Sequence, residues 1–158
     1  MIWSCINALH TRITRCGVVC DAIYSGRGTV AKILVIEDEA NVRTLTEMLL
    51  KRLGYEVLLA DNGWKGLELY RREHPDVIVL DLIMPGMDGI EVLRQIRTVD
   101  VHQRVIVVTA DSRPKREWEV RALGVSEFLV KGSSVHSLGD TLKRLLKTPT
   151  PVIYTPAS

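Results

Sequence analysis

The sequence predicts an α/β domain in which a five-stranded parallel sheet is covered by helices on both faces. Three observations support it: short runs of β-branched residues and leucine, amphipathic segments that alternate with them, and glycine or proline at the junctions. Strands that alternate with helices are joined by right-handed crossovers, which give a parallel sheet buried on both faces. Strands are predicted at 33–36, 56–59, 77–80, 105–108 and 128–130, and helices at about 40–53, 64–74, 88–98, 113–123 and 134–147.

The first strand–helix unit sets the pattern. Its strand, 33–36, is apolar throughout and is followed directly by three acids, Glu37, Asp38 and Glu39. In the helix that follows, apolar residues recur every three or four positions and form one stripe. They are Val42, Leu45, Leu49 and Leu53.

The later units repeat this pattern, and glycine or proline marks the ends of their helices. Gly54 and Gly124 follow the first and fourth helices, where a left-handed residue commonly ends a helix. Pro75 stops the second helix before the third strand, and Pro114 fits the first turn of the fourth helix. The apolar stripes of the second and fifth helices are Leu67, Leu69 and Tyr70, and Leu138, Leu142, Leu145 and Leu146.

The chain is predicted to have three parts. Residues 1–31 differ in composition from the rest and are interpreted as a leader, non-native or disordered, and we hypothesise that the native start is Val30. Residues 32–147 form the single domain, and 148–158, which contain three prolines, form an extended tail. The leader holds every cysteine, but their spacing lacks the paired Cys-x-x-Cys of a strong metal site.

Composition excludes several classes of function. The formal net charge of +2 implies neither nucleic acid nor an acidic membrane surface as a partner. The chain has no uninterrupted apolar run of the roughly 18–20 residues that a membrane span needs. A domain without cysteine fits a reducing compartment, so we expect a cytoplasmic protein with no membrane insertion.

Polar residues whose side chains can bind ligands or take part in catalysis follow four of the predicted strands. In an open parallel sheet, ligands bind at the carboxyl ends of the strands, so these residues can converge. They are Glu37 and Asp38, Asp81, Thr109 and Lys131. Each alone is most simply a cap, a strand end or a solvated surface residue, and it is their joint occurrence that favours a functional site.

The clustered carboxylates indicate a cation. Carboxylates held together raise one another's pKa, so they must share a proton or be held by a positive charge. Hard oxygen ligands in a small cleft favour Mg²⁺. A metal, the Lys131 ammonium and the Thr109 hydroxyl around one carboxylate suit phosphoryl transfer to Asp81.

Four segments carry a strong resemblance to a known family. "ILVIEDE", "VIVLDLIMPGMDGIEVLRQIR", "VIVVTAD" and "EFLVK" occur in order across residues 32–147, and the chain resembles the receiver domains of two-component response regulators. The resemblance implies a flavodoxin-like sheet with strand order 2-1-3-4-5. It also implies that Asp81 accepts a phosphoryl group from a histidine of a sensor kinase or phosphotransfer protein.

The resemblance assigns a role to each residue at the strand ends. Glu37, Asp38, Asp81 and the backbone carbonyl of Ile83 would hold Mg²⁺. Lys131 would form a salt bridge with the acyl phosphate. Thr109 would be the switch hydroxyl that moves to the phosphoryl group, which opens space for the switch aromatic, Phe128, to rotate inward.

A protein partner would read this change on the surface of the helix at 113–123, the strand at 128–130 and the helix at 134–147. The residues proposed for this contact are Arg113, Lys115, Arg116 and Trp118. Trp118 is either a partner anchor or a residue that packs against the sheet or shields the helix. Trp64, on the second helix, is predicted to be partly buried, and a partner role is the less favoured alternative.

Two positions depart from the family pattern. Glu37 stands where many receivers have aspartate, and its longer arm allows ligation through water. Gly132 replaces the proline that usually follows the lysine, so a cis peptide there is not expected, because a non-proline cis bond costs about 2.5–4 kcal/mol. We expect a looser loop before the last helix.

Other functions are weighed against this one. A haloacid dehalogenase-type phosphatase needs a second acid two residues after the nucleophile, and Ile83 occupies that position, so an enzyme is not expected. Direct DNA binding is disfavoured because the tail carries no helix-turn-helix pattern. Two alternatives stay open: a phosphorelay intermediate, and a receiver fragment of a regulator whose output domain is absent.

Overall fold

The computed structural model of the protein describes residues 30–132 and 135–147. The strands are β1 (Lys32–Ile36), β2 (Glu56–Ala60), β3 (Val77–Leu80), β4 (Arg104–Thr109) and β5 (Glu127–Val130). The helices are α2 (Ala40–Arg52), α3 (Gly63–Glu73), α4 (Gly89–Val99), α5 (Pro114–Ala122) and α6 (Val135–Lys147). The predicted leader cysteines, the tail and most of the loop before α6 lie outside the described residues.

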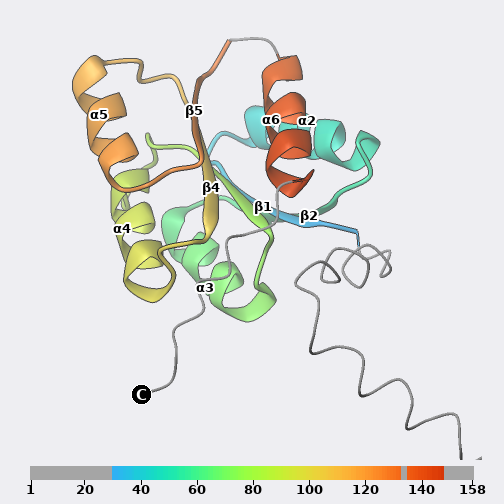
Figure 1. The fold of residues 1–158 in the computed structure, drawn as a ribbon, viewed down its shortest axis with the longest axis horizontal. Helices are drawn as coiled ribbons and strands as arrows, with labels where there is room; N and C mark the ends of the chain where they lie inside the picture. The colour runs from blue at the N-terminus through green and yellow to red at the C-terminus, as the bar shows by residue number, and fades with distance from the viewer. Residues whose placement is uncertain (1–29, 133–134, 148–158) are drawn as a thin grey trace, which may run out of the picture.

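The five strands form one parallel sheet in the order β2-β1-β3-β4-β5, which confirms the predicted topology (Figure 1). In the register of this sheet, Ile33 pairs with Val57 on one side and with Val77 on the other. The chain order reverses between β1 and β3, and such a switch point is where ligands bind in open α/β sheets.

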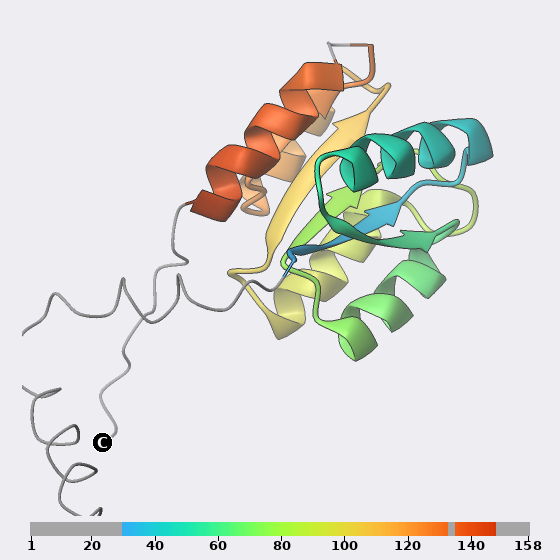
Figure 2. The same ribbon diagram turned by 90° about the vertical axis from the view of Figure 1, so that its right-hand side faces the viewer.

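Helices cover both faces of the sheet (Figures 1 and 2). On one face, Leu34 and Ile36 belong to a core shared with α3, α4 and α5. On the other face, Ile33 and Val35 pack with α2 and α6. Alternate residues of β1 therefore enter opposite cores, as the period of two in a strand requires.

Glycine and proline lie at the helix ends where the sequence predicts them. Gly54 and Gly124 have φ values of 88° and 75°, in the left-handed region, and α5 begins at Pro114. Helix α3 ends before Pro75, as predicted, and its C-cap residue, His74, takes a left-handed conformation with φ of 47°. Every observed boundary lies within one residue of the predicted one. None of the helices in the described ranges is long and apolar enough to cross a membrane.

The prediction about the exposure of Trp64 is wrong. Trp64 is 66% exposed rather than partly buried, because Gly63 and Gly66 are the residues that face inward at the start of α3. Leu45 is also 66% exposed, although it belongs to the predicted stripe of α2, whose fully buried residue is Leu50.

Candidate functional site

The carboxyl ends of β1, β3, β4 and β5 bring the polar residues to one edge of the sheet. Glu37 and Asp38 follow β1, Asp81 follows β3, Thr109 ends β4 and Lys131 follows β5. One carboxylate oxygen from each of the three acids lies within 4.8 Å of the others. Glu37 and Asp81 are each 5% exposed, so two of the three acids are largely out of water, whereas Asp38 is accessible to solvent.

Backbone hydrogen bonds position the two buried acids. The Glu37 N–H donates to the carbonyl of Ala60, and the Asp81 N–H donates to the carbonyl of Ile36, both at 3.0 Å. These bonds continue the pairing of β1 with its neighbours beyond the strand ends. Asp81 and Glu37 therefore start from fixed backbone positions.

The loop from Asp81 to α4 closes tightly on itself. The Gly89 N–H donates to the carbonyl of Leu82 at 3.0 Å. A Cβ atom at Gly89 would lie 2.1 Å from the carbonyl oxygen of Asp81, so a side chain cannot be placed here without moving the backbone. Sequence reasoning did not single out Gly89, although the Asp-Gly pair at the end of the loop was the signal available.

Lys131 lies between the buried acids. Its ammonium donates to Asp81 Oδ2 at 2.6 Å and to Glu37 Oε1 at 2.9 Å. Burial raises the pKa of Glu37, the bond from Lys131 opposes this, and the nearby Asp81 charge adds to it. Burial alone would lower the pKa of Lys131, but the bonds to the two carboxylates outweigh it and the net shift is upward. Lys131 is thus the positive charge that the clustered acids require.

Arg43 on α2 holds the backbone of the acidic loop. Its Nη1 atom donates to the carbonyl oxygen of Glu37 at 2.7 Å and to that of Asp38 at 3.0 Å. Sequence reasoning missed this residue, because its spacing of five to six positions from the acids resembles an ordinary exposed helix position.

The donor set fits a hard divalent cation. The three carboxylates offer oxygen atoms at one point, and Mg²⁺ is commonly bound by one or two carboxylates together with water. The Ile83 N–H donates to Asp81 Oδ1 at 3.2 Å, and its side chain is 55% exposed. The role of the Ile83 carbonyl in metal binding stays a prediction.

The two predicted switch residues are both buried. Thr109 is fully buried, and its Oγ1 atom accepts a hydrogen bond from the backbone N–H of Asp111 at 3.2 Å. Phe128 is 7% exposed, and the Arg121 guanidinium lies over its ring at 6.0 Å from the centroid. The ring is therefore already inside the protein in this conformation, before any inward rotation.

The predicted partner surface is partly engaged in internal ion pairs. Arg113 and Arg116 both contact the buried carboxylate of Asp111, which sequence reasoning did not single out. Trp118 is 74% exposed, so the alternative in which it packs against the sheet is wrong. A cavity of about 300 Å³ lies among Arg113, Lys115, Arg116 and Glu119.

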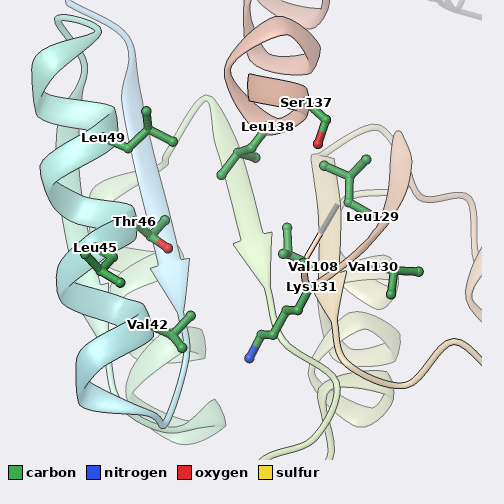
Figure 3. Close-up of a pocket in the computed structure, with 11 residues that line it drawn as sticks. Val42, Leu45, Thr46, Leu49, Val108, Leu129, Val130, Lys131, Ser137 and Leu138 are labelled. Carbon is green, nitrogen blue, oxygen red and sulfur yellow. The ribbon is translucent and has the colours of Figure 1, made fainter. Parts of the chain in front are cut away.

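An apolar groove lies beside the site, between α2 and α6. It has a volume of about 240 Å³, and Figure 3 shows Leu49 of α2 and Leu138 of α6 on opposite sides of it. Leu45 lines the same groove, and so does Lys131. Three residues of the predicted stripe of α2, Val42, Leu45 and Leu49, therefore line a surface groove that reaches Lys131.

Residues 33–143 match a family model described as the response regulator receiver domain. The chain is 33% identical over 115 residues to Sporulation initiation phosphotransferase F of Bacillus subtilis, a match that covers 73% of this chain and 93% of that protein. It is 34% identical over 116 residues to the alkaline phosphatase synthesis transcriptional regulatory protein PhoP of the same organism. That match covers 73% of this chain and 48% of PhoP, so the chain spans about half the length of this relative.

The fold has a close counterpart among solved structures. The response regulator protein TrrA of Thermotoga maritima, determined in complex with Mg²⁺ and BeF, superimposes with a TM-score of 0.68 at 33% identity. The match covers 73% of this chain and 99% of that one.

Proposed function

Since this chain belongs to the response regulator receiver family, we propose that it is a phosphoacceptor and that Asp81 is the residue phosphorylated. The observation that carries the proposal is the position of Asp81, buried at the switch point with Lys131 at 2.6 Å and two further carboxylates around it. Receivers are signalling modules, and we propose that this one catalyses only its own phosphorylation and dephosphorylation. We also place it in the cytoplasm.

The phosphoryl group comes from a phosphohistidine of a sensor kinase or phosphotransfer protein. An Asp81 carboxylate oxygen attacks phosphorus, the phosphorus–nitrogen bond breaks, and the imidazole leaves with the bonding electron pair. In the structure the Lys131 ammonium contacts Asp81 and Glu37. After the transfer it would pair with a phosphoryl oxygen, where the negative charge then lies. Glu37, Asp38, Asp81 and the carbonyl of Ile83 would hold Mg²⁺, which supplies charge neutralisation at the phosphoryl oxygens when it is bound.

Phosphorylation would then act through Thr109. The new group adds nearly two negative charges and strong acceptor oxygens. Thr109 would turn its hydroxyl to donate to them, and Phe128 would keep its buried position. The surface of α5, β5 and α6 would change, and a protein partner would bind there through Arg113, Lys115, Arg116 and Trp118.

The apolar groove between α2 and α6 is the proposed contact for the phosphodonor. Lys131 lines both this groove and the phosphoacceptor site, so a partner helix in the groove would bring its phosphohistidine toward Asp81. Leu45→Glu would place a charge on the groove wall. It should slow transfer from a phosphorylated partner while leaving labelling by acetyl phosphate, which needs no docking, unchanged; slowing of both would contradict the assignment.

The central test uses acetyl phosphate with Mg²⁺ and Asp81→Asn. The variant should not be labelled, and retained labelling at another residue would refute the assignment.

Lys131→Ala should still be phosphorylated but should lose the coupling to partner binding. Addition of EDTA should stop the transfer, and labelling that persists without divalent cation would remove the metal from the proposal.

A second candidate is a phosphorelay intermediate. The observation that favours it is the similarity to Sporulation initiation phosphotransferase F over 93% of that protein. A relay intermediate passes its phosphoryl group on to a second histidine. Incubation of the phosphorylated protein with histidine phosphotransfer proteins would detect this, since label would leave Asp81 and appear on the acceptor. The similarity to PhoP keeps a third possibility, a receiver that works within a larger transcriptional regulator.

A further inference from the structure

The segment between β4 and α5 contains a buried acid that the phosphoacceptor site does not use. Asp111 is 7% exposed and lies two residues beyond Thr109. Its Oδ1 atom accepts from Arg113 Nε at 2.7 Å, its Oδ2 accepts from Arg113 Nη2 at 2.5 Å, and the Arg113 backbone N–H also donates to Oδ1. Such charge-assisted, paired hydrogen bonds are the strong class.

Arg116 connects this acid to the phosphoacceptor loop. Its Nε atom lies 3.5 Å from Asp111 Oδ2, and its Nη2 atom donates to Asp88 Oδ2 at 2.6 Å. Asp88 is the N-cap of α4, where its other oxygen accepts from the Ile90 N–H. One guanidinium thus joins the segment after β4 to the end of the loop that begins at Asp81.

The same segment holds the Thr109 hydroxyl. The N–H of Asp111 donates to Thr109 Oγ1, so this hydroxyl is already hydrogen-bonded within its own loop. A hydroxyl that turns toward a phosphoryl group on Asp81 must leave this bond, and the backbone of Asp111 must move relative to it. Because Arg113 and Arg116 hold the Asp111 side chain, they oppose that movement.

We propose that Asp111 and Arg116 form an ionic lock that stabilises the unphosphorylated position of Thr109. The lock rests on the proposed function of Asp81 and adds a determinant of how readily that residue is phosphorylated. Asp111, Arg113, Arg116 and Asp88 are positioning residues, because they act through Thr109. Opening the lock also releases Arg113 and Arg116, two of the residues assigned to the partner surface, so phosphorylation and exposure of these cations become one event.

The test measures binding of beryllium fluoride with Mg²⁺, a phosphoryl mimic found in the complex of the related TrrA. With a lock of this kind, the apparent affinity equals the intrinsic affinity multiplied by the fraction of molecules in the open state. Asp111→Asn should therefore bind the mimic more tightly, by about tenfold, the effect of losing one charge-assisted hydrogen bond. Titration calorimetry would provide the affinity.

Arg116→Gln separates the lock from simple electrostatics. Removal of a carboxylate near an anionic ligand raises its affinity in either case, but removal of a guanidinium should lower it. The lock predicts the opposite for Arg116→Gln, a gain of several-fold, because the tie to Asp88 is lost. A weaker affinity in this variant would overturn the proposal even if Asp111→Asn behaved as expected.

Two further variants complete the experiment. Arg72→Gln removes a guanidinium from an exposed ion pair with Glu68 on α3, a pair that involves none of the lock residues, so its affinity should stay within twofold of the original. In a Thr109→Ala background, Arg116→Gln should lose its effect, and an equal gain there would overturn the proposed route through Thr109. If the unaltered protein fails to bind the mimic, or Asp81→Asn binds it, the proposed function is wrong. If the unaltered protein binds the mimic but Asp111→Asn and Arg116→Gln leave its affinity unchanged, only the proposed lock is wrong.

Discussion

Helices α4 and α5 cover the same face of the sheet but are attached to it by different forces. Four side chains of α4 are buried in the core, namely Ile90, Val92, Leu93 and Ile96. In α5, all of which the structure describes, only Val120 is buried. The rest of its attachment comes from charged groups, including the pairs Arg116–Asp88 and Arg94–Glu119.

The difference separates a rigid region from an adjustable one. Burial of apolar area is non-directional and is lost only when the helix leaves the core. Exposed or half-exposed ion pairs contribute little each, and their charges can exchange one partner for another. The helix that follows the Asp81 loop is therefore fixed by packing, whereas the helix proposed to meet a partner is held by contacts that can be exchanged.

The largest effect is expected at the first residue of α4. In Gly89→Ala the new methyl group would lie 2.1 Å from the carbonyl oxygen of Asp81 and 2.8 Å from Leu82 Cα, so the backbone at Asp81 must shift. We expect a loss of roughly 3 kcal/mol or more in the free energy of unfolding, at the upper end of overpacking effects, and slower labelling of Asp81. Denaturant unfolding and acetyl phosphate labelling would measure the two effects.

Gly86→Ala is the matched control for that prediction. Gly86 has φ of 83°, but no atom lies within 4 Å of the position that a Cβ would take, so only backbone strain of about 1–2 kcal/mol is expected. Similar losses in the two variants would mean that the close approach at Gly89 is not what constrains the loop.

The packing of α4 is probed by Leu93→Ala. Leu93 is fully buried, and truncation of such a residue leaves a cavity and costs roughly 2–4 kcal/mol. Equilibrium unfolding in urea would give the change. A cost below about 1 kcal/mol would remove the contrast with α5, because α4 would then not depend on its apolar face.

The smaller apolar contact of α5 is probed by Val120→Ala. Loss of two buried methyl groups should cost about 1–2.5 kcal/mol. Because Val120 is the buried apolar side chain of α5, amide hydrogen exchange should rise in α5 well before it rises in α4. Equal increases in both helices would show that they open as one unit.

The smallest effect is expected for the ion pair between the two helices. Arg94→Gln removes an exposed pair with Glu119, which should cost about 0.2–1 kcal/mol and less as salt is added. Thermal unfolding at low and high ionic strength would measure it. A loss as large as that of Leu93→Ala would reverse the comparison, since α5 would then be as firmly held as α4.

Much of this architecture follows from local pattern. The strands, their order and the convergence of Glu37, Asp81 and Lys131 are predictable because a parallel sheet places every carboxyl end at one edge. An apolar run indicates a buried strand, and a glycine after a helix indicates a left-handed residue at its end. Gly54 and Gly124 therefore have the left-handed conformation that the sequence predicts.

What the pattern could not provide is the partner of each charge. Arg113 and Arg116 resemble solvated surface residues in the sequence, yet both contact the buried carboxylate of Asp111. The choice of partner depends on the fold of a short loop, which no periodicity encodes. Trp64 shows the related problem for apolar residues: two small glycines face the core, and the large aromatic ring is left outside.

The exposed positions of Trp64 and Trp118 also make the protein its own optical sensor. The ring of Trp118 is carried by the helix held through exchangeable ion pairs, whereas Trp64 adjoins Gly63, which leaves room for the Met87 side chain in the loop after Asp81. Indole emission responds to water and to nearby charge. The chain also contains Trp3, so that indole must be replaced in both variants. A Trp3→Phe, Trp64→Phe variant would then report on α5, and a Trp3→Phe, Trp118→Phe variant on the loop after Asp81, without any attached dye.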